Sequence, residues 1–223
     1  MARVLEEAAD ALEGTWLFKG ISREELPEAL DLVGATVSSY AADEVVLAAG
    51  SPVTSVYAVV SGRVRMLEED VFGNRTIFGE AGPGNVFAEA LAAVRIQESF
   101  VTVQAVEDSR VLGITLGQLL KPSVRPGRYR DTMIRNLVQI MAKRNMQLHR
   151  KLGVLSCRRT RDKVMSYLDG MAKQTHSRTF DIPLSRQELA DYLCVDRSAL
   201  SSELSRMRQE GLINFKRNHF RLL

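Results

Sequence analysis

The sequence predicts an α+β protein built of three successive parts: a β-barrel or jelly-roll domain over residues 1-123, a long helix within 124-156, and a small helical domain over 157-223. Three observations support this prediction. Short, alternating apolar runs separated by glycine turns fill the first part, as the strands of a barrel or sandwich would. One long apolar stripe at helical spacing marks the second part. The third part contains two short helix patterns followed by a hairpin pattern.

The N-terminal part begins with helix patterns and continues with strand patterns. Helices are expected around Glu6–Leu12 and Arg23–Val33, and a further short helix over Val86–Ala93, whose Ala and Leu content favours that conformation. A turn is expected at Phe72-Gly73-Asn74. The expected strands are Val45–Ala48, Val56–Val60, Arg63–Leu67, Thr76–Gly79, Phe100–Val106 and Arg110–Ile114.

The strand patterns end near Pro126, and a long helix is expected from about Tyr129 to Leu155. A helix of about 27 residues spans roughly 40 Å at 1.5 Å per residue, which is longer than one small domain covers. The apolar stripe therefore favours a parallel helix from a second copy over packing against the chain's own barrel alone, although Arg144 and Asn145 interrupt a clean heptad. The residues expected at the dimer interface are Ile134, Leu137, Met141, Leu148 and Leu152.

After a further expected helix over Thr160–Lys173, the sequence predicts a helix-turn-helix. Ser185 and Glu188 form the Ser-x-x-Glu capping box that starts a helix. Asp196 is suited to cap a second helix, which Gly211 is placed to end. The inner face of this second helix is expected to hold Ala199, Leu200, Leu204 and Met207, and its outer face Arg197, Ser198, Ser201, Ser202, Ser205, Arg206 and Arg208.

The outer face is small, polar and basic, which suits the major groove of DNA. Small side chains let a helix approach the base edges, and an arginine near the helix start can donate two hydrogen bonds to guanine. A basic hairpin turning at Arg217-Asn218 would form a wing beside it; the alternative is a generic helix-hairpin unit without a nucleic-acid partner. The expected base readers are Arg197 (the leading one), Ser198, Ser201 and Ser202, and the expected phosphate contacts are Ser185, Arg186, Gln187, Lys216, Arg217 and His219.

The net charge of +3 conceals a division between the two halves of the chain. Residues 1–123 hold 9 Lys/Arg and 18 Asp/Glu, a net of −9, whereas residues 124–223 hold 21 and 9, a net of +12. A basic domain attached to an acidic one is typical of a polyanion-binding protein. A solvated charged surface would give the same count, so charge alone leaves nucleic-acid binding a hypothesis.

The composition is that of a globular protein, with 45% hydrophobic and 26% charged residues. No apolar run approaches the roughly 18 residues that span a bilayer, and the N-terminus is acidic where a secretory signal needs a basic start. We therefore expect a cytoplasmic location without membrane contact. Cys157 and Cys194 are too few for a disulfide framework or a four-thiolate metal site, and we expect both to be buried.

The segment PLSRQELADYLCVDRSALSSELSRMRQEGLI, followed by FKRNHFRLL, resembles the DNA-binding domain of the Crp/Fnr superfamily of bacterial regulators. The resemblance covers nearly the whole chain, because the superfamily has the same order of β-barrel sensor, dimerisation helix and winged helix-turn-helix. It implies a homodimer that binds an inverted repeat in double-stranded DNA and activates or represses promoters, with RNA polymerase as a partner of an activator. By similarity, base readers fall at Arg197, Ser198 and Ser202. The superfamily's cyclic-AMP receptor has Glu and Arg where the two serines stand, so a different target sequence is expected.

The resemblance also implies an effector in the sensor, held between the barrel and the long helix. The loop GNVFAEALA resembles the superfamily's phosphate-binding cassette, with Glu89 placed for a ribose hydroxyl. The cassette's arginine for the cyclic phosphate falls by spacing at Ser99, and an anionic phosphate without that partner is costly in a partly desolvated pocket. We therefore expect a small organic molecule or acid and not cyclic AMP; Arg95 would be the substitute cation after a loop rearrangement. The effector pocket is expected at Val86, Phe87, Ala88, Glu89, Ala90, Leu91, Ser99 and Phe100.

Other effectors and functions receive less support. Two cysteines cannot supply the four thiolates of the iron-sulfur cluster that oxygen-sensing members hold. A haem- or redox-sensing member is an alternative, for which His149 with nearby Met146 offers the conspicuous axial ligand; a solvated helix histidine is the simpler interpretation. A metal-dependent enzyme of jelly-roll type needs several histidine ligands, but all three histidines follow the barrel. We expect no metal site and no enzyme. A cyclic-nucleotide module of a kinase or channel would need a catalytic or membrane segment that the sequence lacks.

Overall fold

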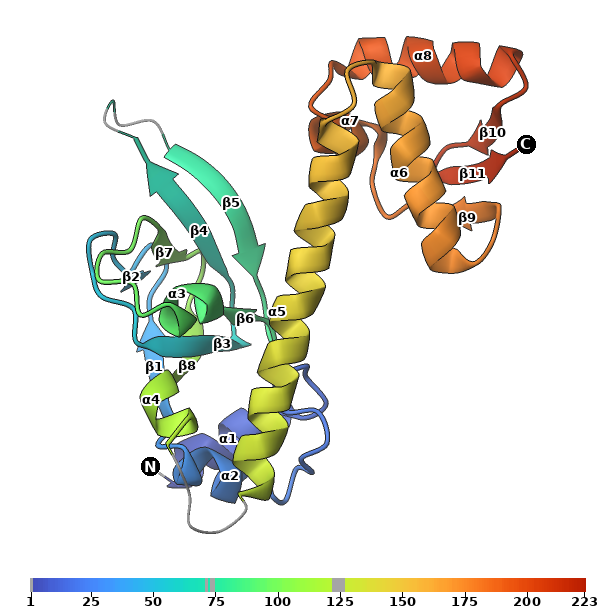
Figure 1. Cartoon of the computed structure of the whole chain (residues 1–223). Helices are drawn as coiled ribbons and strands as arrows, with labels where there is room; N and C mark the ends of the chain where they lie inside the picture. Colours follow the sequence, from blue (N-terminus) through green and yellow to red (C-terminus); the bar gives the residue numbers. More distant parts are fainter. Residues whose placement is uncertain (1, 71, 73–74, 122–126) are drawn as a thin grey trace. The chain divides into compact units, whose positions relative to one another are not determined.

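The computed structural model describes residues 2–70, 72, 75–121 and 127–223 and contains two compact units (Figure 1). The units are Met1–Ala142 and Lys143–Leu223, and the boundary between them falls inside the long helix α5 (Arg128–Leu155). Each unit has its own hydrophobic core. The predicted domain boundary at 123/124 lies outside the described residues. The predicted boundary at 156/157 stays a prediction.

Short strands arranged in two antiparallel sheets form the first unit. The strands are β1 (Thr36–Tyr40), β2 (Val45–Leu47), β3 (Ser55–Ser61), β4 (Val64–Glu69), β5 (Arg75–Ala81), β6 (Val86–Phe87), β7 (Thr102–Ala105) and β8 (Ser109–Thr115). One sheet has the order β1-β8-β3-β6 and the other the order β2-β7-β4-β5. Because the two sheets remain separate, the arrangement is jelly-roll-like and not a closed barrel. The predicted fold class is confirmed.

All six strands predicted from alternation are present. The segment Val86–Ala93, expected to be one helix, instead contains a short strand and a shorter helix. Val86 and Phe87 form strand β6, which pairs with Ala58 and Tyr57 of β3. Both residues are buried. The helix α3 (Glu89–Ala93) begins only after Ala88, whose φ of +60° breaks the extended chain. The expected turn at Phe72-Gly73-Asn74 lies largely outside the described residues.

Helices α1 (Ala2–Leu12), α2 (Leu26–Leu32) and α4 (Leu116–Leu119) complete the first unit. The beginning of α5 belongs to the same core, in which Met133 is fully buried. The amide of Asn136 donates hydrogen bonds to the carbonyl oxygens of Leu17 and Lys19, each at 2.9 Å. These bonds fix the first half of α5 to the N-terminal segment.

The second unit contains three helices and a small sheet after the end of α5. The elements are α6 (Thr160–Thr175), β9 (Thr179–Asp181), α7 (Arg186–Leu193), α8 (Arg197–Gln209), β10 (Ile213–Lys216) and β11 (His219–Leu222). The three strands pair in the order β10-β11-β9. Strand β9 was not predicted; Phe180 in it lies opposite Phe220 of β11, and both are buried. Among the described residues, no helix combines the length and apolarity that a membrane span requires.

Candidate nucleic-acid interface

A complete capping box starts helix α7, as the Ser-x-x-Glu spacing predicted. The backbone N–H of Glu188 donates to Ser185 Oγ at 3.3 Å, and the N–H of Ser185 donates to Glu188 Oε2 at 2.7 Å. The hydrogen bond from the Ser185 backbone holds the pKa of the Glu188 carboxyl below its ordinary value, because that bond favours the charged form. The start of α7 is therefore fixed by two residues that are three positions apart, Ser185 and Glu188.

The turn between α7 and α8 is held from α6. Cys194 ends α7 with a φ of +50°, and Lys163 Nζ donates to the carbonyl oxygen of Leu193 at 2.9 Å. This contact satisfies a carbonyl that the helix end leaves free. The expectation that both cysteines are buried is wrong, because Cys194 is exposed and Cys157 is only partly buried. Asp196 is the N-cap residue of α8 as predicted, but its side chain makes no capping hydrogen bond.

Helix α8 buries one stripe and exposes the rest. Leu200, Leu204 and Met207 are fully buried, whereas Ala199, expected on the inner face, is exposed. One residue rotates the side-chain direction by about 100°, which turns Ala199 to solvent. Gly211 ends the helix as predicted, with a φ of +74°. The predicted outer residues Arg197, Ser198, Ser201, Ser202, Ser205, Arg206 and Arg208 are all exposed.

Arg161 of α6 holds α8 in place through two carboxylates. Its Nε lies 2.7 Å from Glu203 Oε1, and its Nη1 and Nη2 lie 2.7 and 2.8 Å from the two oxygens of Glu210. The hydrogen bonds from Arg161 lower the pKa of Glu210. A bidentate arginine–carboxylate pair fixes direction as well as distance. The contacts of Arg161 with Glu203 and Glu210 therefore orient the C-terminal half of α8. The sequence patterns did not indicate this network.

Strands β10 and β11 and their turn at Arg217–Asn218 form a hairpin that we call the wing. Lys216 lies opposite His219 at its tip, and Arg217 has a φ of +55°. The rings of Phe215 and Phe220 stack with centroids 5.5 Å apart. Arg186 of α7 packs on this pair: its guanidinium carbon lies 5.2 and 5.6 Å from the two ring centroids.

Arg186 therefore connects the start of α7 to the wing. Its Nη2 donates to the carbonyl oxygen of Arg217 at 3.2 Å. Burial lowers the pKa of Arg186, because a cation loses hydration there. The Nη1 atom is buried and makes no hydrogen bond. This site residue of the sequence analysis is half-buried, and its contact with a phosphate stays a prediction.

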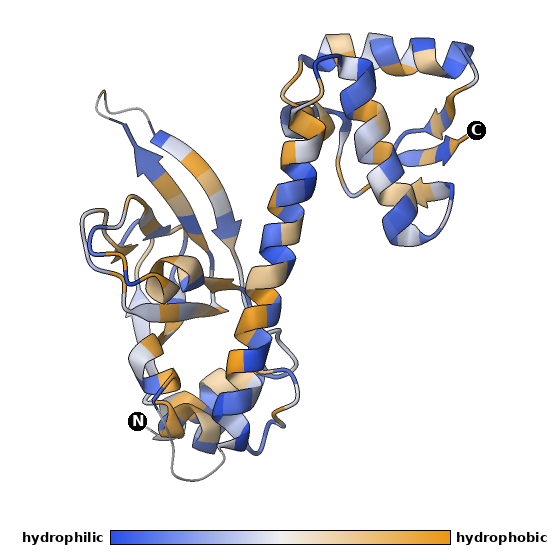
Figure 2. Cartoon of the chain, in the orientation of Figure 1, coloured by the Kyte–Doolittle hydropathy of each residue, from blue (hydrophilic) through white to orange (hydrophobic). Residues whose placement is uncertain are grey.

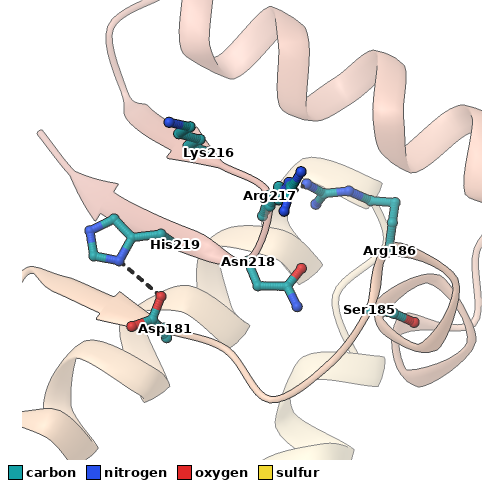
Figure 3. Close-up of a pocket in the computed structure, with 7 residues that line it drawn as sticks. All are labelled: Asp181, Ser185, Arg186, Lys216, Arg217, Asn218 and His219. Carbon is teal, nitrogen blue, oxygen red and sulfur yellow. Dashed lines mark hydrogen bonds and ion pairs between the residues drawn. The ribbon is translucent and has the colours of Figure 1, made fainter.

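An open hollow of about 570 Å³ lies between the start of α7 and the wing (Figure 3). We call it the cationic hollow. His219 Nδ1 lies 2.9 Å from Asp181 Oδ1 at its edge. Gln187 donates along α7 to Asp191 Oδ1 at 2.8 Å, and its predicted contact with phosphate stays a prediction. Asp181 was not predicted for this site, because the three residues of β9 were too short a signal. Asn218 was predicted in the turn of the hairpin but not as a site residue. The hollow is lined by Asp181, Ser185, Arg186, Lys216, Arg217, Asn218 and His219.

The expected effector residues lie in the first unit and differ in exposure. Glu89 and Ser99 are buried at 3% exposure each, whereas Ala90 and Phe100 are exposed. The Ser99 hydroxyl donates to the carbonyl oxygen of Val101 at 2.7 Å, so it supports its own loop. Val86 and Phe87 are buried, and Ala88 and Leu91 are partly buried. Among the described residues, no group of three or more His, Cys, Asp and Glu is arranged to hold a metal.

The residues expected at a dimer interface lie along α5, where hydrophobic and hydrophilic stretches alternate (Figure 2). Leu148 and Leu152 are exposed at 62% and 63%. Leu137 is 5% exposed and packs in the core of its own unit, so it has little surface left for a partner helix. The neighbouring Val138 is exposed at 60% instead. Ile134 and Met141 are partly buried, and the haem-ligand candidates His149 and Met146 are exposed.

Comparison with known proteins assigns both parts of the chain. Residues 37–121 match the model of the cyclic nucleotide-binding domain, and residues 162–223 match the model of the Crp-like helix-turn-helix domain. The chain belongs to the Crp/Fnr superfamily of transcription regulators. In this superfamily the helix-turn-helix domain binds DNA, and the matched residues 162–223 contain α7, α8 and the wing.

Individual relatives from the superfamily match most of the chain. It is 25% identical over 202 residues to the cyclic AMP receptor protein of Thermus thermophilus, covering 91% of this chain and 89% of the relative. It is 26% identical over 179 residues to the transcriptional activator protein FnrA of Stutzerimonas stutzeri, covering 78% and 71%. The second of these relatives is named as a transcriptional activator.

Solved structures show the same fold. The catabolite activator protein of Thermus thermophilus matches with a TM-score of 0.53 and 23% identity, over 94% of each chain. The c-di-GMP responsive regulator CLP of Xanthomonas campestris matches with a TM-score of 0.51 and 20% identity, over 87% of this chain and 98% of that one.

Proposed function

We propose that the protein is a cytoplasmic homodimer that binds an inverted-repeat promoter site and is controlled by a small-molecule effector in its first unit. The observation that carries the proposal is the exposed outer face of α8, which is small, polar and basic and lies above a fully buried inner stripe. Such a face enters the major groove without steric obstruction. Where binding activates transcription, RNA polymerase is the further partner.

Sequence reading is assigned to the first turns of α8. Arg197 is exposed at the helix start, where a guanidinium can donate to O6 and N7 of one guanine. Ser198, Ser201 and Ser202 share its face and are short enough to let the helix backbone approach the base edges. Their hydroxyls both donate and accept, so they read less strictly than the arginine.

Phosphate contacts are assigned to the cationic hollow. Lys216 and Arg217 bring positive charge to it from the wing, and Arg186 brings more from α7. The first backbone N–H groups of α7 and its dipole also favour an anion there. The Nη1 of Arg186 makes no hydrogen bond within the chain but is buried, so the exposed Lys216 and Arg217 are the more accessible donors to a DNA phosphate. These contacts position the protein without specifying sequence.

The homodimer is assigned to the exposed apolar residues of α5. Val138, Leu148 and Leu152 are each at least 60% exposed, and isolated apolar side chains in a row on one helix are stabilised by a second helix. A two-fold dimer presents two α8 helices to the DNA, which requires an inverted repeat.

The effector is assigned to the region of β6 and α3. Cyclic AMP remains outside the proposal, because Ser99 stands where the superfamily's phosphate-binding arginine is expected. The similar protein from Thermus thermophilus is named for cyclic AMP, and that from Xanthomonas campestris is called c-di-GMP responsive. Relatives thus differ in effector, and we propose a small organic molecule or acid here. Calorimetric titration of the full chain against a metabolite panel, cyclic AMP included, tests this assignment. Binding of cyclic AMP alone would contradict it.

The DNA-binding proposal is tested by fluorescence anisotropy with promoter fragments from the source genome and random duplexes of equal length. We expect at least one fragment to bind roughly 10³-fold tighter than random DNA in the effector-bound state. Lys173→Ala removes an exposed cation of α6 and so controls for net charge. It should change neither the affinity for promoter fragments nor the affinity for random DNA. Equal affinity for every fragment and for random DNA, with each panel compound present, would exclude the proposed function.

A further inference from the structure

Asn145 lies in the middle of a stripe on α5 that is exposed except at Met141, which is partly buried against the first core, and whose spacing is stricter than the sequence alone indicated. With Leu137 assigned to its own core and Val138 exposed beside it, the stripe runs through Val138, Met141, Asn145, Leu148 and Leu152. We call these residues the α5 stripe. Successive members are three, four, three and four residues apart, which is the heptad repeat of a two-stranded coiled coil.

We propose that Asn145 sets the parallel, in-register pairing of two α5 helices. The inference rests on the proposed homodimer and names the residue that determines its geometry. The heptad spacing places Val138, Asn145 and Leu152 at the a positions and Met141 and Leu148 at the d positions. Asn145 is therefore no interruption of the repeat but its one polar a position within the stripe, and a polar a position specifies register and oligomeric state at a cost in stability.

A second copy of this chain is the occupant that fits Asn145. A carboxamide carries one acceptor oxygen and two donor hydrogens, so an identical amide across a two-fold axis satisfies it reciprocally. The rest of the α5 stripe offers only apolar surface at neighbouring levels. A partner with leucine or valine opposite Asn145 would bury its amide without a hydrogen bond.

Parallel pairing is also the orientation in which the two amides meet. In parallel two-stranded coils, a positions face a positions of the partner at the same level. An antiparallel pair that brings a residues opposite d residues would place Asn145 against Leu148 or Met141, which cannot satisfy it. The polar residue thus discriminates against slipped and antiparallel pairs by making them leave an amide without a partner.

The first test is the dimer dissociation constant of the full chain, measured by sedimentation equilibrium. We expect Asn145→Val to lower that constant on the order of tenfold, because valine packs better at an a position. The matched control is Gln147→Val, which adds the same side chain to an exposed position of α5 outside the stripe and should leave the constant unchanged. An unchanged or higher dissociation constant for Asn145→Val overturns the proposal.

The second test reports register directly. In a background with Cys157→Ser and Cys194→Ser, Leu148→Cys should form an intermolecular disulfide efficiently, because identical d positions face each other in a parallel pair. Adding Asn145→Val should lower the yield of that disulfide, since slipped pairs are no longer penalised. A yield that stays the same after Asn145→Val contradicts the assigned role.

Leu152→Glu separates this inference from the proposed homodimer. It places a charge in the α5 stripe away from Asn145 and should give monomers. If Leu152→Glu leaves the dimer intact, the dimer assigned to α5 in the proposed function fails. If Leu152→Glu gives monomers while Asn145→Val changes neither affinity nor disulfide yield, the dimer stands and only the role of Asn145 is refuted.

Discussion

Arg186 combines a charge with a structural contact, because its guanidinium packs on Phe215 and Phe220. We predict that Arg186→Lys weakens binding to specific and random DNA by similar factors and also lowers the thermal midpoint of unfolding. Lysine keeps the charge but loses the planar stacking and the hydrogen bond to Arg217. Anisotropy and thermal unfolding measure the two effects. Arg158→Lys, an exposed change in the same unit, should affect neither. An Arg186→Lys effect on only one DNA sequence would contradict a phosphate role.

Arg197 should behave differently from the cations of the wing. We predict that Arg197→Ala relaxes specificity at one base pair by about 1 to 3 kcal/mol, because a bidentate guanine contact is lost. Lys216→Ala should weaken all sequences alike and reduce the salt slope by about 1. Competition binding with single-base variants at several salt concentrations distinguishes the two. Equal losses on specific and random DNA for Arg197→Ala would reassign it to the phosphate backbone.

For single residues, the sequence predicted the interactions that are made with near neighbours in the chain. The Ser185 and Glu188 capping box spans three residues and was predicted correctly. Leu137 and Ala199 were placed on the wrong face, because a helix pattern read without its boundaries is uncertain by one residue, or about 100°. The packing of Arg186 on the wing was not predictable, since its partners lie about thirty residues further along the chain.

Among the elements, α7 depends on its cap. We predict that Ser185→Ala lowers the free energy of unfolding by about 1 kcal/mol, because the N–H of Glu188 loses its acceptor. Urea denaturation measures this loss. Ser205→Ala is the matched control: Ser205 is exposed in the middle of α8 and donates only to the carbonyl of Ser201, so alanine there should be neutral or slightly stabilising. Equal effects of both variants would show that the capping box contributes nothing.

The contact of α6 with α8 predicts a pH dependence. Arg161 lowers the pKa of Glu210 from its ordinary value of 4.5, so the carboxylate binds a proton less readily in the folded state. The resulting stabilisation is complete above pH 4.5 and is lost as pH falls through the lowered pKa of the folded state. Thermal unfolding between pH 7 and 3 should show a decline that is shallower in Arg161→Met than in the exposed control Arg158→Met. Identical profiles would contradict this coupling.

Strands and helices were predictable where an apolar run or a helix cap marked them. Alternation over several residues located six strands, and the caps at Ser185 and Gly211 located the helix-turn-helix. The short elements β6, β9 and α4 were missed, because two to four residues carry too little periodicity. Strand β1 (Thr36–Tyr40) was also missed, because its Thr-Val-Ser-Ser-Tyr has only one aliphatic residue and no apolar run. Strand β9 exists through its pairing with β11, a contact between distant segments that local propensity does not encode.

For the whole molecule, the proposed two-fold dimer predicts the shape of its footprint on DNA. Two α8 helices should protect an inverted repeat whose half-site centres lie about 34 Å apart, one turn of the double helix. DNase footprinting on the tightest promoter fragment tests this spacing. Leu152→Glu should abolish the paired protection, whereas Gln147→Val should preserve it. Protection of a single half-site by the unaltered protein would exclude the two-fold arrangement.

The sequence indicated the order of the parts and the separation of charge between them. It could not show that the two ends of α5 pack into different hydrophobic cores, because a continuous helical stripe does not reveal which core each turn packs against. Met133 is buried in the first unit and Val154 in the second. Which core each end of α5 joins depends on tertiary packing, which the helix pattern does not encode.

The end of α5 belongs physically to the DNA-binding unit. Val154 is 5% exposed within its core, and Lys151 Nζ lies 5.5 Å from the centroid of the Tyr192 ring on α7. A fragment trimmed at the helix-turn-helix alone would lose this support and leave an apolar hole beneath α6 and α7. Recombination that exchanged the first unit would therefore preserve the core of the second unit only if the junction lay N-terminal to Lys151.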